Sequence, residues 1–418
     1  MIQISNINAC EILDSFGNPT IEVEITANNA FSASVIVPND SKHYSEAAPQ
    51  LYDNDQGRYK GRGVQRAVSN IQKVFNEEFN GFPLTEQFQF DSLLTQSAGE
   101  DNQTHPGINT VYGLSLAYAK LSAQITGQTL YRYLGGLNSN IMPVPIIKCI
   151  TPVITDKQFA PPDQISILPI GETFSESLRA GIEIFASIDD ILKDKTQNWQ
   201  GCYSPFLESN IQAIEIILKS IEKAGYNPGK DVFLFLNSPI IKQAANEKLK
   251  YRLPGTKNKV DIDKIIEYRA NICTQYPIAG LQGELSQAAR ADKYKMFEIL
   301  GGTVQIVQEA ENFLSDELLA AELKDPTGNA VSIVPNRLGT ISVVSNMFKI
   351  AKSYGYSTIL KCADYETEDS TFSDLAVAFG SSFIDIGACT RSENVSKYNR
   401  LLKIENSLGA HAVFGQNL

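Results

Sequence analysis

Side chains able to do chemistry gather at the ends of short apolar runs after about residue 142. Glu309 directly follows one run, Lys361 and Cys362 end another, and Asp385 lies in the last of them. With Asp364, these residues form a candidate pocket for a reaction that needs no metal. A cysteine beside a lysine can be an activated thiolate. We favour the alternative that Cys362 is a small residue that fills buried space.

The other run ends carry groups of little reactivity. Amides stand at two of them, Asn237 and Gln282, and a valine stands at a third, Val334. A lyase that uses Mg²⁺ needs several carboxylates around a hard cation and an amine or imidazole base of tuned pKa. Among these ends Glu309 is the one obvious carboxylate ligand, so the residues themselves argue against a magnesium centre.

The apolar runs predict the elements that position these side chains. Each run has the length of a buried strand, and helical segments separate most of them. The runs are 144–149, 165–170, 232–237, 278–282, 304–308, 331–334, 358–362 and 383–386. Eight strands over about 275 residues, mostly alternating with helices, favour a (β/α) barrel. The first two runs have no convincing helix between them, and an open doubly wound sheet is the alternative.

The first part of the chain predicts a separate α+β domain. Residues 20–26 alternate apolar and polar side chains, as a half-buried strand does, and residues 31–38 predict a second strand. Residues 62–136 change to helical spacing. We therefore predict a small α+β domain over residues 1–136 and a barrel domain over residues 142–418.

Composition excludes several classes of function. The 418 residues carry a net charge of -11 with a pI of about 5.0, which disfavours nucleic acid and anionic membranes as partners. No apolar run reaches the roughly 20 residues that span a bilayer, and the first residues do not resemble a signal peptide. Six scattered cysteines without a C-x-x-C pair indicate reduced thiols. These features together lead us to expect a cytoplasmic protein. His43, His105 and His411 show no ligand spacing, so we expect no structural metal site.

Two segments at opposite ends of the chain resemble the enolase family. Residues 13–24, L-D-S-F-G-N-P-T-I-E-V-E, are similar to its early motif L-D-S-R-G-N-P-T-V-E-V-E. Residues 391–405 are similar to its late motif R-S-E/D-R-x-x-K-Y-N-x-L-L-R-I-E. Further similar segments lie in the same order at 61–70, 131–136, 142–145, 221–231 and 366–369. The resemblance runs nearly end to end and implies a small α+β domain before a β2α2(βα)6 barrel, whose first two strands form a hairpin.

The resemblance implies where the magnesium ligands of the family would lie. Its three carboxylate ligands align with Asn237, Gln282 and Glu309. Neutral amides stand at two of these positions, and amide oxygens are weak substitutes for carboxylates around Mg²⁺. We therefore expect that the Mg²⁺ affinity of the family is lost and that the chain has no cofactor.

The catalytic positions of the family also align with unsuitable side chains. The lysine base falls on Val334, the acid of G-D-E-G-G on Gln200, and a second lysine on Asp385. The remaining positions fall as follows: the Gln-Glu pair on Asp163 and Gln164, a loop histidine on Thr155, the H-R-S of S-H-R-S-G on Cys362, Ala363 and Asp364, and the metal-closing loop G-A-S-T-G on 40–44. Because the parts of such a site act together, we predict that phosphopyruvate hydratase activity is lost.

Residues 366–369, E-T-E-D, form an acidic cluster that matches the family's own E-T-E-D. A metal could bind such a cluster. We favour a structural role, in which carboxylates in the first turn of a helix complement its dipole.

The resemblance also implies a quaternary structure. Enolases dimerise through the early strands and the late helix, with ion pairs between the subunits. Glu22, Glu393 and Lys403 keep the expected charges, whereas the early arginine of the family aligns with Cys10. We expect a homodimer or a higher even oligomer, and we consider a hetero-association with an active enolase.

Three hypotheses for the function follow. The leading one is a catalytically inactive enolase homologue with a binding, regulatory or scaffolding role. The second is a metal-independent enzyme with a rebuilt site at the barrel mouth. The third is the glycolytic phosphopyruvate hydratase itself, which converts 2-phosphoglycerate to phosphoenolpyruvate.

Overall fold

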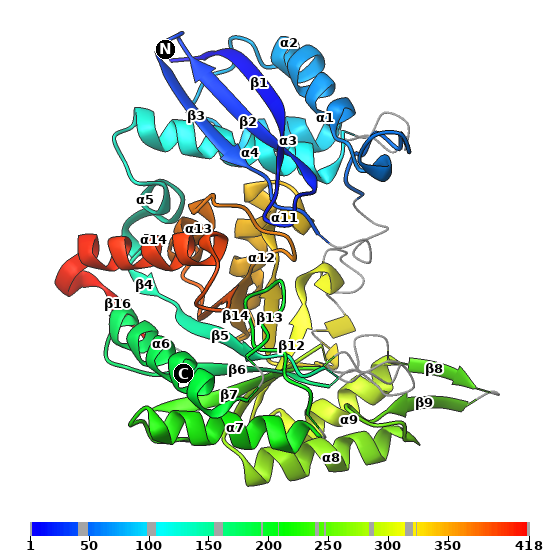
Figure 1. Ribbon diagram of the computed structural model, residues 1–418. Helices are drawn as coiled ribbons and strands as arrows, with labels where there is room; N and C mark the ends of the chain where they lie inside the picture. Colours follow the sequence, from blue (N-terminus) through cyan, green and yellow to red (C-terminus); the bar gives the residue numbers. More distant parts are fainter. Residues whose placement is uncertain are drawn as a thin grey trace.

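The computed structural model places a smaller N-terminal part above a larger barrel (Figure 1). It describes residues 2–40, 49–97, 106–153, 162–193, 195–207, 209–238, 242–245, 248–283, 288–313, 321–322 and 324–415. Among these residues, no helix combines the length and the apolar character needed to cross a bilayer.

The N-terminal part is an antiparallel sheet covered on one face by helices. The sheet has the order β1 (Ile4–Leu13), β2 (Pro19–Ala27) and β3 (Phe31–Ile36). Ile21, Val23 and Ile25 of β2 are fully buried on the face that packs against α4 (Ile108–Ile125). The alternation in β2 therefore predicted its buried face correctly. The other helical segments are α1 (Gln65–Asn70), η2 (Ile71–Phe75), α2 (Asn76–Glu78), α3 (Gln87–Ser97) and α5 (Leu130–Gly135).

The barrel closes in the strand order β11-β12-β13-β14-β15-β5-β6-β7. In chain order its strands are β5 (Val144–Ile150), β6 (Gln164–Pro169), β7 (Val232–Asn237), β11 (Ile278–Gln282), β12 (Gln305–Glu309), β13 (Ala330–Ile333), β14 (Ser357–Lys361) and β15 (Phe383–Gly387). Each apolar run that predicted a barrel strand forms one. The closed barrel confirms the first fold prediction, and the open sheet is wrong.

The barrel begins in the way that the resemblance implied. Strand β6 runs antiparallel to both β5 and β7, whereas the other neighbouring strands are parallel. Two helices follow β6 before β7, which gives the β2α2(βα)6 arrangement. The outer helices are α6 (Phe174–Ile191), α7 (Asn210–Lys223), α8 (Ile262–Gln275), α9 (Arg290–Leu300), α12 (Ile341–Ser353), α13 (Thr371–Ala378) and α14 (Ser392–Leu408).

Side chains fill the interior of the barrel, which is therefore a packed core and not a channel. Val144 and Ile146 of β5 pack there with Phe235 and Ile359. Alternate residues of a strand share a face. Lys148, two positions after Ile146, accordingly lies on the inner face near the mouth.

A small sheet beside the barrel was not predicted. Strands β8 (Lys242–Ala245), β9 (Lys248–Arg252) and β10 (Lys259–Val260) form it and project to one side in Figure 1. The sequence K-L-K-Y-R of β9 has no apolar run. A search for apolar runs could not detect this strand.

Candidate active site at the barrel mouth

The mouth lies at the carboxyl ends of the parallel strands, where two segments of the N-terminal part reach the barrel. The main-chain amide of Ser15 donates to the carbonyl oxygen of Glu366 (2.9 Å). Asn39 and Tyr365 exchange two main-chain hydrogen bonds (2.9 and 3.0 Å). The β1–β2 turn and the segment after β3 therefore lie against the loop after β14. Reacting groups of such barrels lie at this end, so it is the candidate active site.

Amide side chains stand next to one another on one side of the mouth. The strand register places Asn237 of β7 beside Gln164 of β6 and beside Gln282 of β11. Nε2 of the buried Gln282 donates to Oγ of Ser332 (3.1 Å). Nε2 of Gln164 donates to Oε1 of Gln200 (3.0 Å). Both of these amide groups are thus hydrogen-bonded to protein atoms.

The residues at the aligned magnesium positions do not fit that cation. Glu309 is half-buried at the end of β12, and its Oε2 atom has no hydrogen-bond partner among the described residues. Asn237 and Gln282 contribute only neutral side chains. In the part of the chain that the structure describes, no three His, Cys, Asp or Glu side chains are grouped to hold a metal ion. Mg²⁺ in proteins prefers carboxylate and water oxygens, and a single carboxylate with two amides is a poor donor set for it.

The position aligned with the expected base is packed against other atoms. Val334 has no exposed surface and directly precedes the short helix α11 (Pro335–Leu338). In α11, Arg337 donates from Nη2 to Oδ1 of Asp40 (2.8 Å), and Asn336 donates from Nδ2 to Oδ2 of Asp40 (2.9 Å). Asp40 begins the segment aligned with the metal-closing loop, and here the barrel holds its carboxylate in a buried ion pair. Residues 41–44 of that segment lie outside the described residues.

A buried ion pair that the sequence did not predict joins β5 and β15. Nζ of Lys148 lies 3.3 Å from Oδ1 of Asp385, without hydrogen-bond geometry, and both side chains are buried. Burial by itself would lower the pKa of the Lys148 ammonium, but the Asp385 carboxylate outweighs it and the pKa is raised. Lys148 is therefore a cation at neutral pH and not a base. The available signal was a lysine inside an otherwise apolar run.

A second buried charge pair lies behind the amides. Asp163, aligned with the glutamine of the family's Gln-Glu pair, accepts two hydrogen bonds from the fully buried guanidinium of Arg269 on α8 (2.6 and 2.9 Å). Ser238, which follows β7, bonds to both of them. Sequence reasoning missed Arg269 because an arginine on an amphipathic helix is usually exposed.

The cysteine at the mouth is not an activated nucleophile. Cys362 is buried, and burial, followed by the nearby carboxylate of Glu366, raises the pKa of its thiol well above the ordinary value of 9.0. An activated thiolate needs the opposite shift. The position therefore supports the interpretation of Cys362 as a small buried residue.

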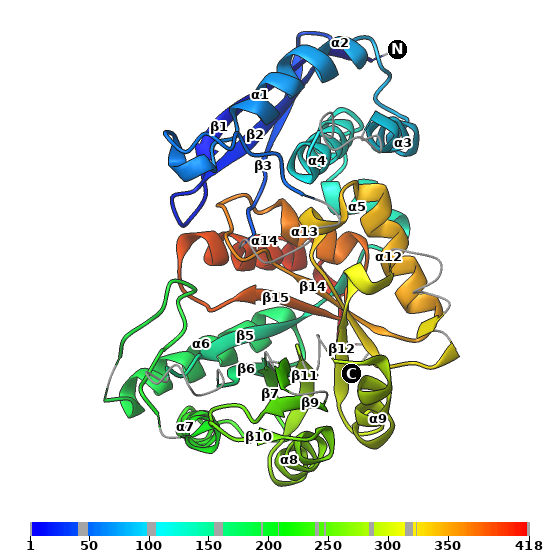
Figure 2. The ribbon, with the colours of Figure 1, turned by 90° about the vertical axis from the view of Figure 1, so that its right-hand side faces the viewer.

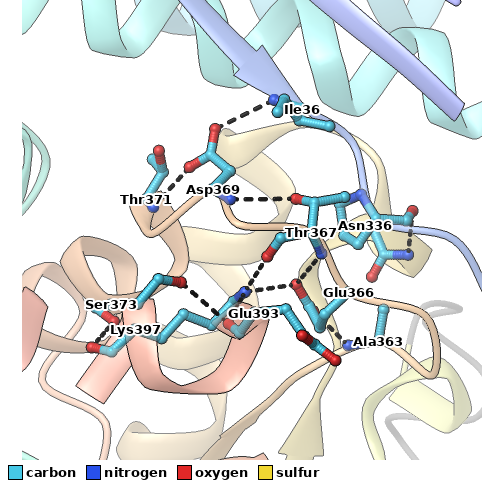
Figure 3. Close-up of polar contacts among 12 residues, drawn as sticks. Ile36, Asn336, Ala363, Glu366, Thr367, Asp369, Thr371, Ser373, Glu393 and Lys397 are labelled. Carbon is cyan, nitrogen blue, oxygen red and sulfur yellow. Dashed lines mark hydrogen bonds and ion pairs between the residues drawn. The ribbon is translucent and has the colours of Figure 1, made fainter. Parts of the chain in front are cut away.

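The late motif of the sequence is bound to the acidic cluster through Lys397 of α14. This fully buried lysine lies 3.0 Å from Oε2 of Glu366 and donates to the carbonyl oxygens of Thr367 (2.7 Å) and Glu393 (2.9 Å) (Figure 3). Burial by itself would lower the pKa of Lys397, but Glu366 outweighs it and the pKa is raised. The lysine of the late motif, Lys397, is thus a buried structural cation.

The acidic cluster is structural, but our expectation about its place was wrong. Residues 366–369 precede α13 and do not form its first turn. Asp369 alone acts at the start of the helix, where its Oδ1 atom accepts from the main-chain amide of Thr371 (2.7 Å). Its Oδ2 atom accepts from the amide of Ile36 in β3 (3.1 Å) (Figure 3). The cluster therefore connects α13 to the N-terminal sheet.

The described cavity at the mouth is small. Its volume is about 30 Å³, which holds a few water molecules, whereas ordinary ligand pockets measure about 300–1,000 Å³. Its lining includes Ser15, Lys148, Trp199, Gln200, Asp364 and Glu366.

The predicted pocket residues are only partly brought together. Lys361 of β14 lies beside Asp385 of β15 in the strand register. Asp364 lines the cavity, whereas Glu309 is on β12, two strands away from β14. Thr155, like His43 and His105, lies outside the described residues.

Comparison with protein-family models gives two matches that follow one another along the chain. Residues 4–134 match the model described as "Enolase, N-terminal domain". Residues 139–417 match the model described as "Enolase, C-terminal TIM barrel domain". The matched ranges correspond to the N-terminal sheet with its helices and to the closed barrel.

Proposed function

The chain belongs to the enolase family, and on that premise we propose that it is a member without hydratase activity that binds or regulates another molecule. The observation that carries this proposal is the fully buried Val334 at the end of β13, in the position of the family's lysine base. A valine has no proton acceptor. No adjustment of its surroundings can make it a general base.

The electrostatics of the mouth support the same proposal. A reaction that generates a carbanion next to a carboxylate needs concentrated positive charge, which enolase-superfamily enzymes obtain from one or two Mg²⁺ ions beside a Lys or His base. Here the buried cations Lys148, Arg269 and Arg337 are each paired with a carboxylate of the protein. Their charge is already compensated before a substrate arrives.

A direct assay tests the proposal. With saturating 2-phosphoglycerate and Mg²⁺, we expect turnover at least about 10⁴-fold below that of an active enolase, because a general base alone contributes about 10²–10⁴-fold. An active enolase in the same buffer is the control for the assay, and circular dichroism is the control for folding. Turnover within about a hundredfold of the active enzyme would contradict the proposal and favour the hydratase hypothesis.

A metal-independent enzyme is the second candidate, and the Lys148–Asp385 pair beside the cavity favours it. Buried charged pairs in a cleft are typical of functional sites. Two observations count against it. The raised pKa of Lys148 disfavours it as a base, and the raised pKa of Cys362 disfavours it as a nucleophile. We therefore place this candidate after the binding role.

We further propose a homodimer that uses the early strands and the late helix. Glu22 lies on the face of the N-terminal sheet opposite α4, and Lys403 of α14 is exposed. Glu393 is half-buried in the first turn of α14. These charges are available to a second subunit, although exposed pairs of this kind contribute little energy individually.

The mass in solution tests the dimer. We expect about twice 46.0 kDa at micromolar concentration. Lys403→Glu should shift the equilibrium toward monomer, and the charge swap Glu22→Lys with Lys403→Glu should restore the dimer. A monomer for the unmodified chain would contradict the proposal, and mixing with an active enolase then tests for a hetero-association.

A further inference from the structure

Three aromatic side chains from distant parts of the chain meet above the mouth. Phe16 lies in the turn between β1 and β2, Trp199 in the loop between α6 and α7, and Tyr365 in the loop after β14. The ring centroids of Phe16 lie 5.1 Å from Tyr365 and 5.8 Å from Trp199, and Trp199 lies 5.3 Å from Tyr365. Each ring thus contacts the other two within the distances at which aromatic pairs attract one another.

Local hydrogen bonds fix the turns that carry two of the rings. Oδ1 of Asp14 accepts from the main-chain amides of Phe16 (2.9 Å) and Asn18 (2.8 Å), which fixes the turn that carries Phe16. Oδ1 of Asn198 accepts from the amides of Gln200 (3.0 Å) and Cys202 (3.1 Å), which fixes the turn that carries Trp199. The rings are therefore presented by ordered turns.

An arginine strengthens the contact from the N-terminal side. The guanidinium of Arg62 lies 5.9 Å from the ring centroid of Tyr365 and 5.8 Å from that of Tyr52. Its Nη1 atom donates to Oδ1 of Asn18 in the β1–β2 turn (2.9 Å). One cation thereby connects the turn of Phe16 with the ring of Tyr365.

The aromatic contact lies next to the mouth cavity on the side of the N-terminal turn. Ser15 and Trp199 both line that cavity, together with Lys148. Figure 2 shows the β1–β2 turn descending from the N-terminal sheet toward the barrel. Phe16 and Trp199 remain 55% and 42% exposed, so these rings lie at the surface and are not part of the core.

The three rings also stand where the aligned motifs have no aromatic residue. The early motif L-D-S-R-G has arginine at the position of Phe16. The motif G-D-E-G-G has aspartate at the position of Trp199, and S-H-R-S-G has glycine at that of Tyr365.

We propose that Phe16, Trp199 and Tyr365 form an aromatic latch that holds the β1–β2 turn closed over the barrel mouth without a ligand. The main-chain bonds of Ser15 to Glu366 and of Asn39 to Tyr365 then form because the turn is already in place. A molecule that reaches the buried Lys148–Asp385 pair from this side has to open the latch first. The latch does not depend on whether the chain catalyses a reaction.

The single tryptophan of the chain makes the latch directly observable. Phe16→Ala removes one ring of the latch, and its native side chain is half-exposed, so the variant keeps the core intact. We expect stronger quenching of Trp199 fluorescence by acrylamide. Hydrogen exchange at the amides of Ser15, Asn39 and Tyr365 should become about 5- to 100-fold faster, the effect of losing the two aromatic pairs that Phe16 makes. Tyr365→Ala, which opens the latch from the barrel side, should have the same effect on the Ser15 and Asn39 amides.

The matched control is Phe88→Ala, because Phe88 is an exposed phenylalanine of the same N-terminal part (79% exposed) on α3. It should change neither the quenching nor the exchange at the mouth. Phe16→Tyr keeps a ring and should behave as the unmodified chain does. The latch is wrong if Phe16→Ala and Phe88→Ala give the same quenching and exchange rates, or if Phe16→Ala accelerates exchange equally throughout the N-terminal sheet.

Discussion

The two sides of the barrel mouth bury their polar groups in different ways. On the side of β14, β15 and β5, two buried carboxylates each lie beside a lysine of the protein: Glu366 beside Lys397, and Asp385 beside Lys148. On the side of β6, β7 and β11, the foremost groups are neutral amides that bond to neighbouring side chains: Gln164 to Gln200, and Gln282 to Ser332.

The difference shows how an enolase barrel can be stable without a metal ion. A buried charge is costly unless an opposite charge lies beside it. On the first side, Glu366 and Asp385 each have a lysine as that partner. Carboxylates on the second side would depend on a bound cation, and amides at Asn237 and Gln282 remove that dependence.

The largest expected effect comes from removing the buried cation Lys397 on the side of β14, β15 and β5. Lys397→Met leaves the buried carboxylate of Glu366 without its partner, and we expect a loss of about 3–5 kcal/mol in the free energy of unfolding. Urea denaturation followed by circular dichroism measures this loss. The double variant Lys397→Met with Glu366→Gln should lose less, because no charge is left unpaired. A single variant that is as stable as the unmodified chain would contradict the structural role of the late motif.

The raised pKa of Lys397 predicts how this contribution depends on pH. Its folded-state pKa lies above its unfolded value, so the stabilisation is complete below the unfolded pKa of about 10.4. It is lost as the pH rises through the folded-state pKa. The unmodified chain should therefore lose stability above about pH 10.4, and Lys397→Met should lack that part of the loss.

A smaller effect is expected on the side of β6, β7 and β11, where the buried groups are neutral amides. Gln282→Glu places a carboxylate at a buried position (2% exposed) beside Asn237, and we expect about 1–3 kcal/mol of destabilisation at neutral pH. Burial raises the pKa of the new carboxyl, so the loss should shrink as the pH falls and the group binds a proton. Gln89→Glu, at an exposed position of α3, is the matched control and should change stability little.

Magnesium distinguishes two interpretations of the same variant. If the amide side chains alone prevent Mg²⁺ from binding at this mouth, Mg²⁺ should restore the stability that Gln282→Glu loses. We expect no such recovery, because Asn237 remains an amide and Glu309 would be the only other carboxylate among the aligned ligands. The melting temperature with and without Mg²⁺ decides between them.

Sequence reasoning worked for features that depend on residues close together in the chain. The apolar runs located the strands of the barrel, because a strand buried on both faces needs apolar side chains almost throughout. The alternation in residues 20–26 identified the buried face of β2 for a similar reason. The resemblance between motifs supplied the hairpin at the start of the barrel, which the spacing of runs left open. The strand β9 was missed because it is not an apolar run: K-L-K-Y-R alternates charged and apolar residues over only five positions.

Sequence reasoning could not predict contacts between residues that lie far apart in the chain. Arg269 and Asp163 lie 106 positions apart, and Arg337 and Asp40 lie 297 positions apart. Nothing in the local pattern of either partner indicates the other. Phe16, Trp199 and Tyr365 are likewise single aromatic residues in polar loops until the fold brings them into contact.

By itself, the sequence determined the family, the order of strands and helices, and the kinds of side chain at the strand ends, because residue type and short-range spacing are properties of the chain. Only the tertiary structure decided which of those groups are partners. Burial and pairing depend on the distance between atoms in space: they made Lys148 a fixed cation, left Cys362 a neutral thiol, and brought three loops together over the mouth.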